Sequence, residues 1–230
     1  MLRRLIKASA VVVVAGLAVA ACSPVKMGAA AVVGNQRITI ATLGTEVTNL
    51  SQAAAKYPTV VNLNPSQETQ STLTWLIRYQ INEQVARQAG ISVSPAQAEQ
   101  ALSQAYTTAK SAAEQQGLTN VTLSLILAAS GIPPNTSTEL GRYEAIANQY
   151  LKAANGGTAP AAGSAASTAA GNKLGKAECL AAKALNISVN PQFGQLDYSQ
   201  YQVVAAPPAV SRTQGPVKAA ASPSATAPAC

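Results

Sequence analysis

The thiol of Cys22 is the group in this chain whose neighbours best predict covalent chemistry. It directly follows Val19-Ala20-Ala21, the end of an apolar run that begins at Ala8 and contains only one polar residue, Ser9. Three basic residues stand ahead of that run. A charged start, an apolar middle and a small-residue end are typical of an export signal. The pattern predicts cleavage between Ala21 and Cys22, which leaves the thiol on the first residue of the mature protein.

The four residues Val-Ala-Ala-Cys at 19–22 resemble the bacterial lipobox, at which the cysteine thiol is acylated and the chain is cut just before it. This resemblance implies lipidation of Cys22 through a diacylglyceryl thioether, with palmitate-type chains. Two or more acyl chains hold a protein stably on a membrane, whereas one chain binds marginally. The resemblance therefore implies a lipoprotein on the extracytoplasmic face of the cell membrane. An ordinary secretory signal or a short membrane anchor is the alternative, although a membrane-spanning helix needs about 20 apolar residues.

The two remaining cysteines, Cys179 and Cys230, are candidates for a disulfide bond. Export makes such a bond chemically permitted. Cys179 could instead be a small buried hydrophobic residue on a helix. Cys230 could also stay free or pair between molecules.

The residue inventory argues against an enzyme. The chain contains no histidine, which excludes Ser-His and Cys-His nucleophile pairs and most zinc sites. The acidic residues are dispersed, with no close pair for acid and base catalysis. Gly156-Gly157 lies in a low-complexity stretch and does not resemble a phosphate-binding loop. We expect no catalytic residues, no metal and no cofactor.

The charge of the mature chain does not indicate nucleic-acid binding. Three of the 16 basic residues lie in the signal, which leaves 13 against 9 acidic residues and a net charge of +4. The remaining bases are scattered and are not interleaved with aromatic residues. We expect no nucleic-acid partner.

The spacing of hydrophobic residues, together with the residues that cap or end helices, predicts a mainly α-helical fold. Gly34-Asn35, between two β-branched runs, predicts a short N-terminal hairpin because this dipeptide tolerates the positive φ of tight turns. Helices are expected from hydrophobic spacing and from cap residues. Their approximate positions are 40–57, 70–89, 95–117, a short helix after Thr119 or Asn120, one that starts with a capping box at Thr136-Ser137-Thr138-Glu139, and one from Lys173.

Composition shifts divide the chain into six parts. We expect a signal peptide at 1–21, a tether at 22–29, a helical domain at 30–153, a flexible linker at 154–172, a closing helix and extended segment of the same domain at 173–204, and a disordered tail at 205–230.

Two segments carry a resemblance to a known family. The stretch Ala30–Thr39, followed by a helix and then by IRYQINEQVARQAGISV at 77–93 and Ser94-Pro95, resembles the SurA N-terminal domain. The late Val-Asn-Pro-Gln-Phe-Gly at 189–194 is similar to the Val-Asn-Pro-Arg-Phe-Gly motif that often closes SurA- and PpiD-like chains. The likeness covers roughly 30–153 and 173–198. It implies a SurA-N-like helical domain to which the C-terminal helix and a short strand return.

The resemblance implies a chaperone-like module that binds extended or unfolded segments of exported proteins. Many relatives insert a parvulin prolyl-isomerase domain where this chain has only the 154–172 segment, which is too short for a packed domain. Parvulin sites also use histidines. We therefore expect no prolyl-isomerase activity.

Trp75, Leu76 and Tyr79 are the candidates for a client-binding surface, because they widen the apolar stripe of their helix beyond one packed face. The alternative is that all three belong to the core. Tyr143 and Tyr150 carry the same two interpretations. The functional alternative to a chaperone is a structural or adapter lipoprotein that recruits one envelope protein, or a relative whose fold merely presents the tail or linker.

Overall fold

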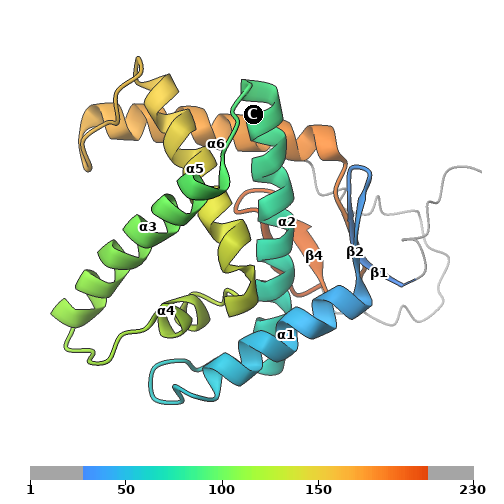
Figure 1. The fold of residues 1–230 in the computed structure, drawn as a ribbon. Helices are drawn as coiled ribbons and strands as arrows, with labels where there is room; N and C mark the ends of the chain where they lie inside the picture. Colours follow the sequence, from blue (N-terminus) through green and yellow to red (C-terminus); the bar gives the residue numbers. More distant parts are fainter. Residues whose placement is uncertain (1–27, 207–230) are drawn as a thin grey trace, which may run out of the picture.

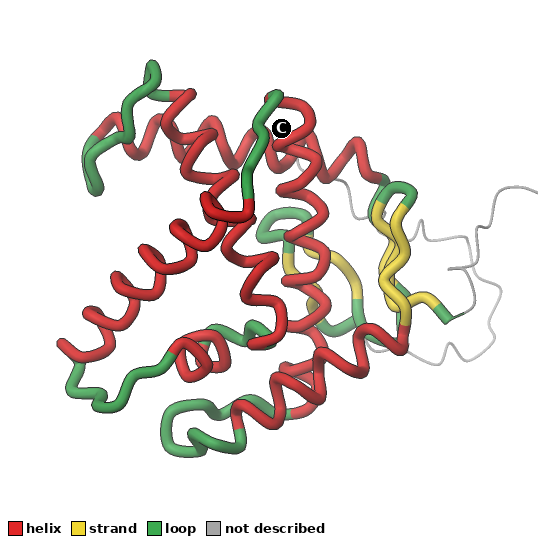
Figure 2. Tube along the Cα trace, viewed as in Figure 1, coloured by secondary structure: helices red, strands yellow, loops and turns green. Residues whose placement is uncertain are grey.

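The computed structural model describes residues 28–206. The predicted signal peptide, the predicted lipidation site at Cys22, Cys230 and nearly all of the predicted tail lie outside the described residues. Within residues 28–206 the fold is mainly helical, with a short N-terminal strand pair and a few C-terminal strands, as predicted (Figures 1 and 2).

The N-terminal hairpin forms where Gly34-Asn35 predicts it. Strands β1 (Ala29–Val33) and β2 (Gln36–Thr39) pair antiparallel, with Val33 opposite Gln36. In the turn, Gly34 and not Asn35 has a positive φ, +58°. Strand β3 (Ser188–Val189) pairs antiparallel with β1, which gives the sheet order β2-β1-β3. The C-terminal part of the chain therefore returns to the N-terminal hairpin, as predicted.

Six α-helices lie within residues 28–206, and α2 is central to their packing (Figure 1). The helices are α1 (Ile40–Ala54), α2 (Pro65–Ala89), α3 (Pro95–Gln115), α4 (Leu123–Ala129), α5 (Ser137–Ala154) and α6 (Ala165–Leu185), with the 3-10 turn η1 (Pro134–Thr136) ahead of α5. Helix α2 contacts α1, α5 and α6, while α3 packs mainly on α5. The main core joins β1, α1, α2 and α6.

Cap residues fix most helix ends. At the start of α3 the side chains of Ser94 and Gln97 form the capping box that the sequence predicts. Gly90 ends α2 in the left-handed conformation, with φ +65°. Helix α2 begins earlier than predicted, at Pro65, because Asn64 and Gln67 form a second capping box ahead of it.

The capping box predicted at Thr136 is not formed. The Thr136 hydroxyl donates to the Pro133 carbonyl oxygen at 2.9 Å and shares a hydrogen bond of 3.0 Å with the Tyr79 hydroxyl. Its oxygen is thus engaged across the fold, and the first turn of α5 has no side-chain cap.

Part of the segment predicted as a linker is helical. Helix α6 begins at Ala165 rather than at Lys173, with Ser164 accepting a hydrogen bond from the Ser167 amide at 3.0 Å. Alanine has the highest helix propensity, so an Ala-rich run after a serine cap forms a helix despite its low complexity. Only residues 155–164 connect α5 to α6.

A second strand pair closes the fold against α2. Strands β4 (Gln195–Asp197) and β5 (Gln202–Val204) are antiparallel, and the Val203 amide donates to the buried Thr74 hydroxyl at 2.8 Å. None of the helices in residues 28–206 combines the length and hydropathy that crossing a membrane requires.

Candidate functional site

Arg78 joins the centre of α2 to the turn between β4 and β5. Its Nη2 donates to the Gln200 carbonyl oxygen at 2.8 Å, and its Nε donates to that of Tyr201 at 3.3 Å. Its guanidinium carbon also lies 5.3 Å from the centroid of the Trp75 ring, within the range of a cation–π interaction. These contacts hold the guanidinium at the wall shared by two surface hollows, which we call together the Arg78 groove.

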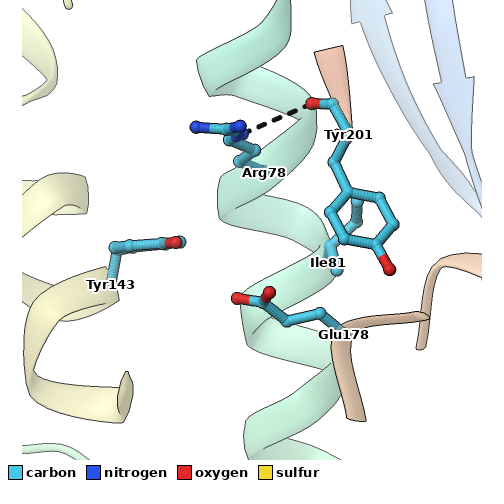
Figure 3. Close-up of a pocket in the computed structure, with 5 residues that line it drawn as sticks. All are labelled: Arg78, Ile81, Tyr143, Glu178 and Tyr201. Atoms are coloured by element: carbon cyan, nitrogen blue, oxygen red, sulfur yellow. Dashed lines mark hydrogen bonds between the residues drawn. The ribbon is translucent and has the colours of Figure 1, made fainter. Parts of the chain in front are cut away.

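The first hollow has a volume of about 120 Å³ and lies between α2, α5, α6 and the β4–β5 turn. Its lining residues are Arg78, Ile81, Tyr143, Glu178 and Tyr201. Figure 3 shows the two tyrosines on opposite sides of the space, with the Arg78 and Glu178 side chains entering from different elements. Tyr201 has a φ of +49°, which a bulky residue rarely adopts. Strain of this kind costs about 1–3 kcal/mol and is concentrated at ligand clamps and active sites.

Three groups in the first hollow, Glu178, Tyr143 and Tyr201, have raised pKa values, and burial is the largest cause in each case. Burial raises the pKa of the Glu178 carboxyl, and the nearby Arg78 charge offsets part of that rise. Burial, with a smaller contribution from Glu178, raises the pKa of Tyr143 to about 12. The Tyr143 hydroxyl therefore stays protonated at neutral pH and can donate a hydrogen bond, while Glu178 can accept one. The hollow has room for one side chain or peptide unit and is smaller than the pockets that hold cofactors.

The second hollow has a volume of about 300 Å³ and lies beside Trp75. Its walls come from the loop before α2, from α2, from the residue after α4 and from β5. They are lined by Leu63, Gln67, Gln70, Ser71, Thr74, Trp75, Arg78, Ser130, Gln202 and Val203. The three glutamine amides can each donate and accept hydrogen bonds, and the indole offers an apolar face. Such a lining suits an extended peptide, which presents both a polar backbone and side chains.

The three predicted surface residues have different positions in the structure. Trp75 is half-buried and lines the second hollow. Leu76 is partly buried against the main core. Tyr79 is 6% exposed, and its hydroxyl shares a hydrogen bond with that of Thr136. Tyr79 therefore belongs to the core, which was the alternative to a surface role. Burial raises the pKa of Tyr79.

The other two tyrosines named from the sequence help to position helices. The Tyr143 ring packs edge-on against Trp75, with centroids 5.8 Å apart, and thereby holds α5 against α2. The Tyr150 hydroxyl donates to the Lys173 carbonyl oxygen at 3.4 Å, which links α5 to α6. Tyr143 also lines the first hollow, whereas Tyr150 does not.

Sequence reasoning missed Arg78, Glu178 and Tyr201. Arg78 and the β4–β5 turn are more than a hundred residues apart, and no local pattern pairs them. The sequence predicts an extended segment within 173–204, but it does not indicate the helix that this segment meets.

Cys179 is buried on α6 and is disulfide-bonded. Its partner lies outside the described residues, so the predicted pairing with Cys230 stays a prediction. Within residues 28–206, no three side chains of the His, Cys, Asp and Glu types come together as they would to hold a metal ion.

Comparisons of the chain with protein-family models, with curated proteins and with solved structures find no match in any of the three. The resemblance to the SurA N-terminal domain therefore stays a prediction from the sequence motifs.

Proposed function

We propose that this protein is a lipoprotein, anchored at Cys22 to the extracytoplasmic face of the membrane, that binds extended segments of exported or unfolded proteins without catalysis. The observation that carries the proposal is the Arg78 groove, whose two hollows share one fixed guanidinium. The lipobox-like sequence and the SurA-like motifs support the location and the class of client.

The groove offers an extended chain the contacts that it needs. Each residue of such a chain exposes one N–H donor and one carbonyl acceptor. Glu178 and the glutamine amides accept from peptide N–H groups, and Tyr143 and the same amides donate to carbonyls. Trp75 and Tyr201 supply flat apolar faces for side chains of the client.

The chemistry of the groove supports binding rather than bond cleavage. Among its lining residues, the hydroxyls of Ser71 and Ser130 have no histidine to activate them, because the chain contains none. The raised pKa of Tyr143 keeps its hydroxyl protonated at neutral pH, so almost no phenolate is present to act as a base. We therefore retain a non-catalytic role and expect no acceleration of prolyl isomerisation.

An adapter that recruits one envelope protein is the second candidate, and the exposed apolar residues favour it. In residues 28–206 the exposed large hydrophobic side chains are Ile40, Val60 and Leu180, which lie on α1, on the loop after α1 and on α6. A general holdase is expected to have a contiguous apolar patch of several hundred Å². A mixed groove with few aromatic anchors also fits a selective partner.

The discriminating experiment uses the soluble form that begins at Ser23. Two unrelated unfolded proteins are allowed to aggregate with and without substoichiometric to equimolar amounts of this form. Suppression of both supports the holdase, and Trp75→Ala should weaken it while Leu180→Ala, an exposed apolar change on α6, should not. Suppression of neither contradicts the holdase and favours the adapter, for which capture of one envelope partner by the lipidated protein is the next test.

A further inference from the structure

The described chain ends beside the Arg78 groove. Gln202 and Val203 line its second hollow, and Ala206 is the last described residue. The segment that follows, 207–230, contains five prolines, the basic residues Arg212 and Lys218, and no acidic or aromatic residue. The described chain that leads into this segment therefore passes along one wall of the second hollow.

The disulfide bond of Cys179 points to where the segment ends. The chain has three cysteines, so the partner of Cys179 is Cys22 or Cys230. A Cys22 sulfur in a thioether cannot also form a disulfide bond, which leaves Cys230, the last residue. Cys179 follows Glu178, which lines the first hollow. A Cys179–Cys230 bond would thus attach the far end of the segment next to the opposite wall.

The segment and the groove are chemically matched. Proline-rich chains favour the polyproline II conformation, whose carbonyls are free to accept hydrogen bonds and which docks on aromatic surfaces at a low entropic cost. Trp75 and Tyr201 provide such surfaces, and Gln70 and Gln202 provide amide donors. Glu178 in the first hollow is an acceptor for a basic side chain. In polyproline II the 207–230 segment would extend about 70 Å, enough to follow the groove and return to α6.

We propose that residues 207–229 occupy the Arg78 groove of their own chain, held there by the Cys179–Cys230 disulfide bond. This inference rests on the proposed function, because it makes the tail a competitor of the client at the same site. A segment tethered at both ends has an effective concentration in the millimolar range, so even weak binding keeps the groove substantially filled. The apparent affinity for a client equals the affinity of the open groove multiplied by the fraction of molecules whose groove is open. Reduction of the disulfide frees one end of the tail and favours client binding.

The first test is peptide mapping of the lipidated protein under non-reducing conditions. The proposal expects a peptide that joins Cys179 to Cys230. A bond between Cys179 and Cys22, or a free Cys230, overturns it.

The second test measures acrylamide quenching of Trp75, the single tryptophan of the chain, in the oxidised soluble form without any client. The variant replaces the five tail prolines with serine (P207S, P208S, P216S, P223S and P228S), and the control replaces three tail serines with alanine (S211A, S222A and S224A). We expect the proline variant to raise the quenching constant about twofold or more and the control to leave it unchanged. Reductant, or Cys230→Ser, should give a smaller increase of the same sign.

Equal quenching in the wild type and the proline variant overturns the proposal. Shielding of Trp75 that appears only at high protein concentration also overturns it, because the occupant would then be a second copy. Since no client is present, these outcomes are independent of the aggregation assay. Failure of the reduced soluble form, in which the disulfide no longer holds the tail, to suppress aggregation would contradict the holdase alone.

Discussion

The amide of Gly34 donates a hydrogen bond of 2.6 Å to the carbonyl oxygen of Leu185, the last residue of α6. The contact ties the turn of the N-terminal hairpin to the end of the closing helix. It also orders the chain just before β3, which pairs with β1. The position of α6, and with it the position of Glu178 in the groove, depends on this joint.

Gly34→Ala should therefore destabilise the fold. A Cβ at Gly34 would lie 2.9 Å from Leu185 Cδ2, and the residue has a left-handed φ of +58°. We expect a loss of about 1–3 kcal/mol in the free energy of unfolding, measured by urea denaturation. Gly44→Ala is the matched control, because Gly44 lies within α1 with open space around it and should gain about 0.5–1 kcal/mol. Equal stability of Gly34→Ala and the wild type would contradict the close packing of the hairpin turn against Leu185.

Glu83 and Arg142 form an ion pair that connects α2 to α5. Arg142 donates to both carboxylate oxygens of Glu83 and also to the Val93 carbonyl oxygen at 3.1 Å. Both side chains are partly exposed to solvent, so Glu83→Gln should cost only about 1 kcal/mol, and less in high salt. Glu114→Gln removes the exposed Lys110–Glu114 pair at 3.9 Å and should cost less than about 0.5 kcal/mol. If Glu114→Gln lowered the free energy of unfolding as much as Glu83→Gln, the claim that the Glu83–Arg142 pair contributes more to stability would be wrong.

Glu178 should make stability fall as the pH rises. Burial raises its pKa in the folded state above the ordinary value of 4.5, although the Arg78 charge opposes the rise. Between the two pKa values the folded state holds more protons than the unfolded state, so the free energy of unfolding decreases with pH. Glu178→Gln removes this contribution. The free energy of unfolding of the variant, relative to that of the wild type, should therefore increase from pH 4.5 upward and then level off.

Urea denaturation across a pH series tests this expectation. Glu99→Gln, an exposed change of the same charge on α3, controls for net charge. Burial also raises the pKa of Glu144, but that group is present in both proteins and cancels from the difference. A relative stability of Glu178→Gln that decreases with rising pH would show that the Arg78 charge outweighs burial.

Lipidation at Cys22 should decide where the protein resides. Cys22→Ser removes the thiol that we propose carries a diacylglyceryl group, so we expect the protein to move from the detergent phase to the aqueous phase in a phase-partition assay. Cys179→Ser is the control and should stay in the detergent phase. Retention of Cys22→Ser in the detergent phase would contradict the lipid anchor.

The sequence predicted those parts of the fold that depend on neighbouring residues. The Ser94–Gln97 capping box and the end of α2 at Gly90 follow from local chemistry, and both are present. The start of α6 at Ala165 was missed because alanine-rich composition is shared by flexible linkers and helices. The absence of a cap at Thr136 was missed because its hydroxyl bonds to Tyr79, far away in the sequence.

The candidate groove was only partly predictable for the same reason. Trp75 was named from the width of one helical stripe, and the structure places it at the second hollow. Arg78, Glu178 and Tyr201 meet only after α6 and the β4–β5 pair fold back on α2. Charge and spacing along the sequence cannot indicate which distant segments close a groove.

The most direct test of the proposed function is the fluorescence of Trp75 during titration with an unfolded client. The reduced soluble form beginning at Ser23 is used, so that the disulfide does not hold the tail. Binding in the groove predicts a saturable change in the emission of this single tryptophan. Gln70→Ala, which removes an amide from the same hollow, should weaken the affinity by roughly 3–10-fold, since a hydrogen bond contributes about 0.5–1.5 kcal/mol. Unchanged emission up to about 1 mM client, a binding free energy weaker than about 4 kcal/mol, would contradict client binding in the groove.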